Sequence, residues 1–131
     1  MIVKRLDHIN IHTRDMTGTV RFYNALLGLE ARTAPEKPPE ERQWLYDTGN
    51  RAVIHLNLAG SDTTIPRDVV PGDPTGAIHH VAFECSDLDD MLGRLDSHGV
   101  SFQRNEIPSI RLTQLFVTDP NNVLLELNFR Y

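Results

Sequence analysis

The chain has 131 residues, 40% of them hydrophobic and 24% charged, which bounds it to one domain or two very small modules that share a core and excludes wholesale disorder. The formal net charge of −5 leaves no basic surface for phosphates, and no apolar run can span a bilayer, so we expect neither a nucleic-acid nor a membrane partner. The N-terminus lacks a signal-peptide pattern and the only cysteine is Cys85, so the expected location is cytoplasmic.

The first half of the chain predicts a strand, a helix and three further strands. Apolar and polar residues alternate over residues 3–12, which indicates a half-buried strand. Asp15 then stands at an N-cap position and Gly28 at a left-handed C-cap position. The helical stripe between them consists of Met16, Val20, Tyr23 and Leu27. Strands are expected near residues 29–33, 43–47 and 52–58, with a polar loop over 34–41 and a turn over 47–50.

The second half repeats this order. The alternating segment is 78–85, Asp87 is the N-cap candidate, and Gly99 follows the helical stripe. That stripe consists of Leu88, Met91, Leu92 and Leu95. Strands are expected near 101–105, 112–118 and 123–129, with a turn over 119–122. The sequence therefore predicts one domain, residues 1–131, built from two modules at about 1–58 and 78–131 and joined by a linker over 59–77.

An internal repeat supports this division. Residues 6–15 resemble residues 78–87, which pairs His8 with His80 and Asp15 with Asp87. After a gap of one residue in the alignment of the two halves, further residues pair in order: Gly28 with Gly99, Gln43 with Gln114, Asn50 with Asn121, Leu56 with Leu127, and Asn57 with Asn128. These matches, in order and with one gap, predict a duplicated unit.

Four predicted strands each have one apolar face and one face with an ionisable group, because alternate side chains share a face. The ionisable groups are His8, His55, His80 and Glu126, at repeat-equivalent positions. Three imidazoles and a carboxylate suit a divalent transition metal. Four protein ligands on a six-coordinate ion leave two neighbouring positions for adjacent substrate oxygens, which gives Lewis-acid catalysis. The alternative is that each is a structural or solvated side chain.

Other polar side chains share these faces or precede the last hairpin. Asn10, Asn57, Asn128 and Glu84 lie on the predicted ligand faces, and Gln114 and Phe116 lie on the strand before the last turn. They are candidates to orient ligands or to contact substrate. The alternative is that they only solvate the wall of a cleft. Cys85 falls on the apolar face and is interpreted as a small core residue rather than a nucleophile.

Several segments carry a resemblance to a known family: Leu-Asp-His-Ile at 6–9, Phe-Tyr at 22–23, Leu-Gly-Leu at 27–29, His-Val-Ala-Phe at 80–83, and the segment from Asp119-Pro120 to Leu125-Glu126-Leu127. Together they resemble the vicinal oxygen chelate superfamily of glyoxalase I, bleomycin-resistance proteins, fosfomycin-resistance enzymes and extradiol dioxygenases. The resemblance implies an α+β fold in which paired βαβββ modules form a cupped mixed sheet with helices outside, in a homodimer. It also implies that His8, His80 and Glu126 are metal ligands, with His55 in the fourth ligand position.

This chain differs from each class of protein in the superfamily at one or more positions, and these differences help to choose among the classes. Glyoxalase I usually has a carboxylate where this chain has His55. Fosfomycin-modifying enzymes carry further residues beyond the final glutamate strand. The 2-His-1-carboxylate triad of extradiol dioxygenases maps onto His8, His80 and Glu126, with an acid/base histidine on the strand of His55, but these enzymes usually have a tyrosine where this chain has Phe116. Bleomycin-binding proteins lack the metal triad.

The favoured hypothesis is a metal-dependent lyase or isomerase that acts through a metal-stabilised enediolate on a small substrate with two adjacent oxygens. The catalytic candidates are Glu126, as the base, and His55; the metal ligands are His8, His55, His80 and Glu126; the substrate-binding candidates are Asn10, Asn57, Gln114, Phe116 and Asn128. The cofactor is one divalent ion: zinc, nickel, cobalt, manganese or iron. The alternatives are an Fe(II) extradiol dioxygenase and a bleomycin-resistance-type binding protein.

Overall fold

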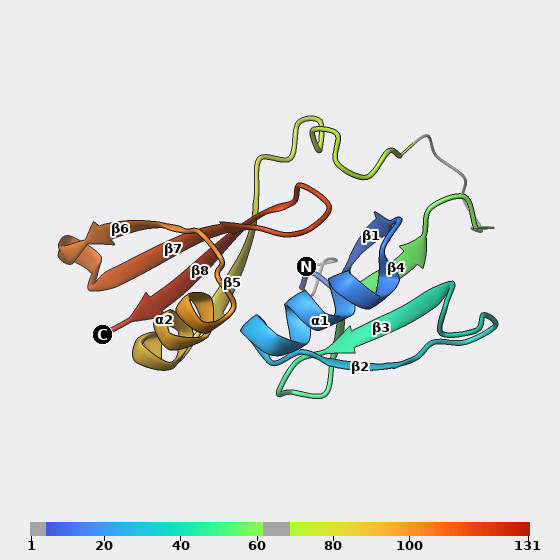
Figure 1. The fold of residues 1–131 in the computed structure, drawn as a ribbon. Helices are drawn as coiled ribbons and strands as arrows, with labels where there is room; N and C mark the ends of the chain where they lie inside the picture. Colours follow the sequence, from blue (N-terminus) through green and yellow to red (C-terminus); the bar gives the residue numbers. More distant parts are fainter. Residues whose placement is uncertain (1–4, 62–68) are drawn as a thin grey trace. The chain divides into compact units, whose positions relative to one another are not determined.

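The structure, a computed structural model of the chain, describes residues 5–61 and 69–131. The chain divides into two compact units, Met1–Pro71 and Gly72–Tyr131. Each unit contains a strand, a helix and three further strands in that order, as the repeat predicts (Figure 1). Part of the predicted linker, residues 62–68, lies outside the described residues. No helix in the part of the chain that the structure describes is long and apolar enough to cross a membrane.

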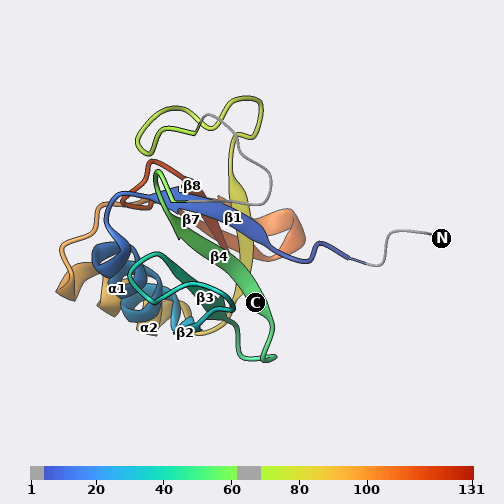
Figure 2. The ribbon, with the colours of Figure 1, turned by 90° about the vertical axis from the view of Figure 1, so that its right-hand side faces the viewer.

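The first unit is a four-stranded mixed sheet with one helix against it. Its elements are β1 (Ile9–Thr13), α1 (Met16–Leu27), β2 (Glu30–Thr33), β3 (Arg42–Tyr46) and β4 (Ala52–Leu58). The strand order is β1-β4-β3-β2, with β1 parallel to β4 and the other pairs antiparallel. Tyr23 and Leu26 of α1 are buried with Leu45, Ile54 and Leu56 of the sheet. Figure 2 shows α1 along one side of this sheet, to the left of β4, and the described residues of this unit contain no second helix to cover the other face.

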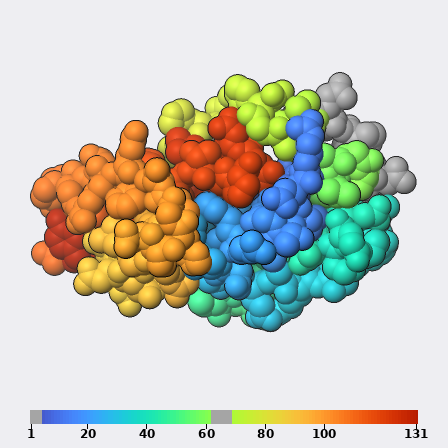
Figure 3. Space-filling model, in the orientation of Figure 1, coloured from blue at the N-terminus to red at the C-terminus, as the bar shows by residue number. Residues whose placement is uncertain are grey.

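The second unit repeats the same topology. Its elements are β5 (Val81–Cys85), α2 (Leu88–Ser97), β6 (Gln103–Ile107), a 3-10 turn η1 (Pro108–Ile110), β7 (Leu112–Thr118) and β8 (Leu124–Arg130), in the sheet order β5-β8-β7-β6. Met91 and Leu95 of α2 are buried, and so are Leu115, Leu125 and Leu127 of the sheet. The outer side of α2 is at the surface in Figure 3, where its atoms are gold.

The helices begin and end where the sequence predicts. The carboxylate of Asp15 accepts the backbone N–H of Gly18, and the carboxylate of Asp87 accepts that of Asp90. Gly28 ends α1 with a φ of 70°, and Gly99 follows α2 with a φ of 63°. Glycine is favoured at both positions because this left-handed backbone strains residues with a Cβ.

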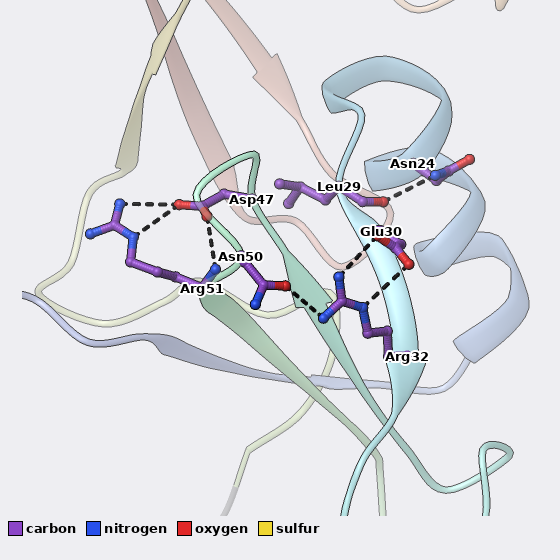
Figure 4. Close-up of polar contacts among 7 residues, drawn as sticks. All are labelled: Asn24, Leu29, Glu30, Arg32, Asp47, Asn50 and Arg51. Atoms are coloured by element: carbon purple, nitrogen blue, oxygen red, sulfur yellow. Dashed lines mark hydrogen bonds and ion pairs between the residues drawn. The ribbon is translucent and has the colours of Figure 1, made fainter.

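Each final hairpin is closed by an aspartate-led turn, as predicted. The Asp47 carboxylate accepts the backbone N–H of Arg51, 3.0 Å away, and also pairs with the Arg51 guanidinium (Figure 4). Asp119 accepts the backbone N–H of Val123 in the same way, at 2.8 Å. In the first unit Asn50 of the turn also accepts a hydrogen bond from Arg32, which pairs with Glu30 on β2. The carboxylates thus fix the turns that deliver β4 and β8 to their sheets.

A β-bulge in the first unit changes the offset between the last two strands of the two units. Tyr46 pairs with Ala52 but Leu45 pairs with Ile54, so Val53 has no partner on β3. In the second unit the corresponding ladder is continuous, with Thr118 opposite Leu124 and Val117 opposite Leu125. The extra residue in β4 therefore shifts the alignment of β4 with β8 by one residue relative to that of β3 with β7. It is a second change of offset, in addition to the earlier one between the aspartate N-caps and the pair Gly28 and Gly99.

Two predicted repeat pairs are wrong for this reason. Gln114 lies opposite Asn128, and the residue in the same position opposite Asn57 is Arg42 rather than Gln43. Likewise, the turn residue with a left-handed backbone in both units is Asn50 in the first and Asn122, not Asn121, in the second. The pairs of Gly28 with Gly99 and Asn57 with Asn128 are consistent with the observed ladders and caps.

The first strand of each unit starts later than predicted. β1 begins at Ile9, opposite Ile54, and β5 begins at Val81, opposite Leu125. Each is an edge strand with a single neighbour, so its ladder can start only where that neighbour supplies partners. His8 and His80 consequently lie one residue before their strands. The α+β class and the two βαβββ modules are confirmed.

Candidate functional site

In the first unit, two of the predicted metal ligands lie in contact. His8 precedes β1 and His55 lies on β4, and their rings stack with centroids 3.7 Å apart and planes 9° apart. Trp44 of β3, directly opposite His55, stacks on the same imidazole at 4.2 Å. Since two parallel rings at these distances cannot share one face of an imidazole, His55 lies between His8 and Trp44. Sequence reasoning missed Trp44, although it precedes Leu45 on a predicted strand.

Burial, followed by the neighbouring charge of His8, lowers the pKa of His55 to about 4. His55 is therefore a neutral imidazole at physiological pH, the form that metal ligation requires.

Asp7 fixes which nitrogen of His8 is available. The Nδ1–H of His8 donates to the Asp7 carboxylate at 2.6 Å, so Nε2 is the nitrogen left for a ligand. This hydrogen bond is also the main reason that the pKa of Asp7 lies below its ordinary value. A carboxylate on the second nitrogen of a ligating imidazole fixes the tautomer and the ring orientation. The sequence shows Asp7 beside His8 but not this contact.

Asn10 and Asn57, both predicted to contact substrate, are joined to each other. The Asn57 amide donates to the Asn10 side-chain oxygen at 3.2 Å, and the Arg42 Nε–H donates to the Asn57 side-chain oxygen at 2.8 Å. Arg42 also donates to the carbonyl of Pro35. Asn57 is buried and Asn10 is exposed, so Asn10 is the one of the two that can reach a ligand.

In the second unit, His80 and Glu126 face each other. The Nε2 of His80 lies 3.7 Å from Oε2 of Glu126, which is on β8. The Nδ1 of His80 is 3.0 Å from Nδ1 of His79. Both histidines precede β5, where strand alternation does not apply, so their side chains can lie on the same side of the chain. Contact with His79 directs Nε2 of His80 toward the carboxylate.

A network of amide side chains holds Glu126. Gln114 on β7 donates to Oε1 at 2.6 Å, and Asn128 donates to Oε2 at 3.2 Å. The oxygen of Gln114 accepts a hydrogen bond from Asn105 of β6, which orients the Gln114 amide. Both carboxylate oxygens thus have donors on the same face of the sheet. Gln114 and Asn128, predicted to contact substrate, contact the predicted base.

Phe116, Glu84 and Cys85 make no contact with the side chains of His80 or Glu126 among the hydrogen bonds and ion pairs described above. Phe116 lies directly opposite Glu126 in the β7–β8 ladder and lines an open pocket. Glu84 is exposed and pairs with Arg130 at 3.6 Å. Cys85 is half-buried rather than part of the buried core, and burial raises the pKa of its thiol to about 11, which fits the interpretation that it is not a nucleophile.

Of the two pairs of predicted ligands, the donor atoms of His80 and Glu126 fit a divalent metal ion. Two neighbouring ligands with bonds of about 2.1 Å stand roughly 3 Å apart, so the 3.7 Å between His80 and Glu126 needs only a small side-chain movement. His8 and His55 are different, because the nitrogen lone pairs of stacked rings lie in parallel planes and do not converge. Among residues 5–61 and 69–131, neither unit by itself gathers three His, Cys, Asp or Glu side chains around one point.

The sequence pattern of the glyoxalase/bleomycin resistance protein/dioxygenase superfamily matches residues 5–127. The chain belongs to this superfamily. Over 126 residues it is 27% identical to a protein of Arabidopsis thaliana named glyoxylase I 4, covering 93% of this chain and 68% of the relative.

Solved structures show the same glyoxalase-like fold. A virulence protein from Salmonella typhimurium is 22% identical, with a TM-score of 0.75 and full coverage of both chains. A lactoylglutathione lyase from Agrobacterium tumefaciens is 18% identical, with a TM-score of 0.69 over 98% of this chain and 96% of the lyase. At these identities the likeness establishes the fold.

Proposed function

We propose that the protein is a metal-dependent lyase or isomerase that acts on a small substrate with two adjacent oxygens. The observation that carries this proposal is the His80–Glu126 pair, in which Gln114 and Asn128 hold the carboxylate by both oxygens. Membership of the superfamily and the glyoxalase I relative support it. The ligands would be His8, His55, His80 and Glu126.

A divalent ion, when bound, would polarise two adjacent substrate oxygens and stabilise negative charge that develops on them. Glu126 would receive the proton removed from the neighbouring carbon. The hydrogen bonds from Gln114 and Asn128 keep the carboxylate oriented, which reduces the cost of positioning it against the substrate. Asn10, exposed on the ligand face of the first sheet, would hydrogen-bond to the substrate.

A second candidate is an extradiol dioxygenase. Two histidines and one carboxylate, His8, His80 and Glu126, form the ligand set of many ferrous oxygenases. In this alternative His55 is an acid/base residue rather than a ligand. The third candidate, a binding protein of the bleomycin-resistance type, requires no metal.

The identity and amount of bound metal separate these candidates. We expect about one zinc, nickel, cobalt or manganese ion per chain in untagged protein purified anaerobically without chelator, and most of it should be lost in His80→Ala. His12→Ala is the matched control, because His12 lies on β1 outside the proposed ligand set and should leave the metal content unchanged.

The same preparations test the chemistry. With that metal bound, the protein should exchange the carbon-bound proton of an α-hydroxyketone with deuterium from the solvent, and Glu126→Gln should stop the exchange. Iron at one per chain, with oxygen uptake on a catechol, would instead establish the dioxygenase. Protein that neither contains metal nor takes it up on titration would contradict both enzymes and favour a binding role.

A further inference from the structure

The second unit carries an open pocket of about 890 Å³ that the proposed ligands do not account for. Its lining residues are His79, Val100, Ser101, Phe102, Gln103, Phe116, Thr118 and Leu124. They come from the segment before β5, the loop between α2 and β6, the first residue of β6, and the facing ends of β7 and β8. The volume lies within the range of small-molecule sites.

The pocket adjoins the His80–Glu126 pair. Leu124 and Glu126 are two residues apart on β8 and share one face of the sheet, and Phe116 lies directly opposite Glu126. On the other side, His79 of the pocket wall contacts His80 through their ring nitrogens. A ligand held at Glu126 and His80 can therefore extend into the pocket without crossing a strand.

The walls of the pocket suit an uncharged, apolar group. Val100, Phe102, Phe116 and Leu124 supply apolar surface, and Phe102 is 39% exposed as a residue. The lining contains no carboxylate, ammonium or guanidinium group, and the His79 imidazole is its one ionisable side chain. A charged substituent would therefore lose most of its hydration there with few charged partners to replace it. An exposed aromatic ring in a concave wall beside convergent polar groups is typical of a ligand site.

We propose that this pocket receives an apolar alkyl or aryl substituent of the substrate, joined to the carbon skeleton that carries the two adjacent oxygens. This inference rests on the proposed function, because it assumes that the oxygens are held at the metal ligands. It narrows the substrate class to molecules with a polar, chelating end and an apolar end. The loop of Val100 and Phe102 then determines specificity.

Hydroxamates test the pocket, because each presents two adjacent oxygens to a metal and their alkyl chains can be lengthened one methylene at a time. On metal-loaded protein we expect affinity to rise by about fourfold per methylene from acetohydroxamate to hexanohydroxamate, the gain typical of burying a methylene group. Phe102→Ala should flatten this dependence, and Gln103→Trp, which fills the pocket, should weaken the long hydroxamates. Both variants should leave acetohydroxamate affinity unchanged.

Ile110→Ala is the matched control, because Ile110 is an exposed apolar residue that does not line the pocket. It should retain the full chain-length dependence. Metal-dependent binding whose strength does not vary with chain length, or whose length dependence survives both pocket variants, would overturn the pocket assignment and leave the proposed function intact. Absence of any metal-dependent hydroxamate binding would overturn the proposed function and this inference together.

Discussion

At the scale of single residues, the site depends on side chains that hold other side chains. Glu126 has a hydrogen-bond donor for each of its oxygens, and His8 has a carboxylate on its Nδ1. Such partners reduce the freedom of a ligand or base before substrate arrives, which lowers the cost of binding a metal ion. Gln114 is the central residue of the network, since it contacts Glu126, Asn128 and Asn105.

Replacement of Gln114 tests this role. We expect Gln114→Leu, which keeps the size of the side chain but removes its hydrogen bonds, to lower metal affinity by about 10- to 100-fold. Isothermal titration of metal-free protein with zinc measures this change. Gln43→Leu is the control, because the Gln43 amide donates to the carbonyl of Pro39 rather than to a site residue. Equal losses in the two variants would show that Gln114 acts only through stability.

At the scale of elements, the bulge at Val53 lets β4 and β8 place His55 and Glu126 at equivalent positions. His55 lies opposite Trp44, and Glu126 lies opposite Phe116, although β4 contains one residue more between its turn and this position. If Val53 were paired in a regular ladder instead of forming a bulge, His55 would lie on the helix-covered face of the sheet. The reason is that a shift of one residue moves every side chain of a strand to the opposite face.

Deletions in the two strands should therefore have opposite consequences. Deletion of Val53 produces a continuous ladder like that of β7 and β8, so we expect a folded protein destabilised by about 2 kcal/mol or less, from the lost burial of one side chain. Deletion of Leu124, also half-buried but in a strand without a bulge, should move Glu126 or the turn out of register and lower the melting temperature much further. Thermal unfolding followed by circular dichroism compares the two, and equal melting temperatures would contradict this account of the bulge.

At the scale of the whole molecule, each unit covers only one face of its sheet with a helix. The other faces carry the proposed ligands, and units this small bury little surface alone. Neither unit by itself gathers three candidate ligands among the described residues, so a complete set would require a first unit and a second unit. We propose that the protein is a homodimer. A site shared between the copies would take its first unit from one copy and its second unit from the other.

Complementation tests this arrangement. A chain with His8→Ala and His55→Ala should bind no metal at the site, and neither should a chain with His80→Ala and Glu126→Ala. Co-expression of the two should restore about one metal ion per mixed dimer, because one of its two sites then contains all four ligands. Elemental analysis of the doubly tagged, purified dimer measures this recovery. A mixed dimer without metal, or a wild-type protein that sediments as a monomer, would instead place the site within one chain.

The sequence by itself determined most of the fold. Period-2 alternation, two aspartate N-caps and two glycines after the helices are local signals, and each of them predicts its element from a few neighbouring residues. The repeat added the topology, because two segments with the same signals in the same order form the same unit. The same alternation assigned His55 and Glu126 to the faces opposite the buried residues of β4 and β8, and burial confirms this.

Only the tertiary structure decided which side chains meet. The donors to Glu126 come from two strands, and the stack on His55 combines residues far apart in the chain, so no local pattern reveals them. The bulge at Val53 was also hidden, because an unpaired residue is defined by its partner strand. It misaligned Gln43 with Gln114 in the sequence comparison. Strand periodicity gives the face of a side chain, but cross-strand register decides its neighbours, and register depends on where the strands pair.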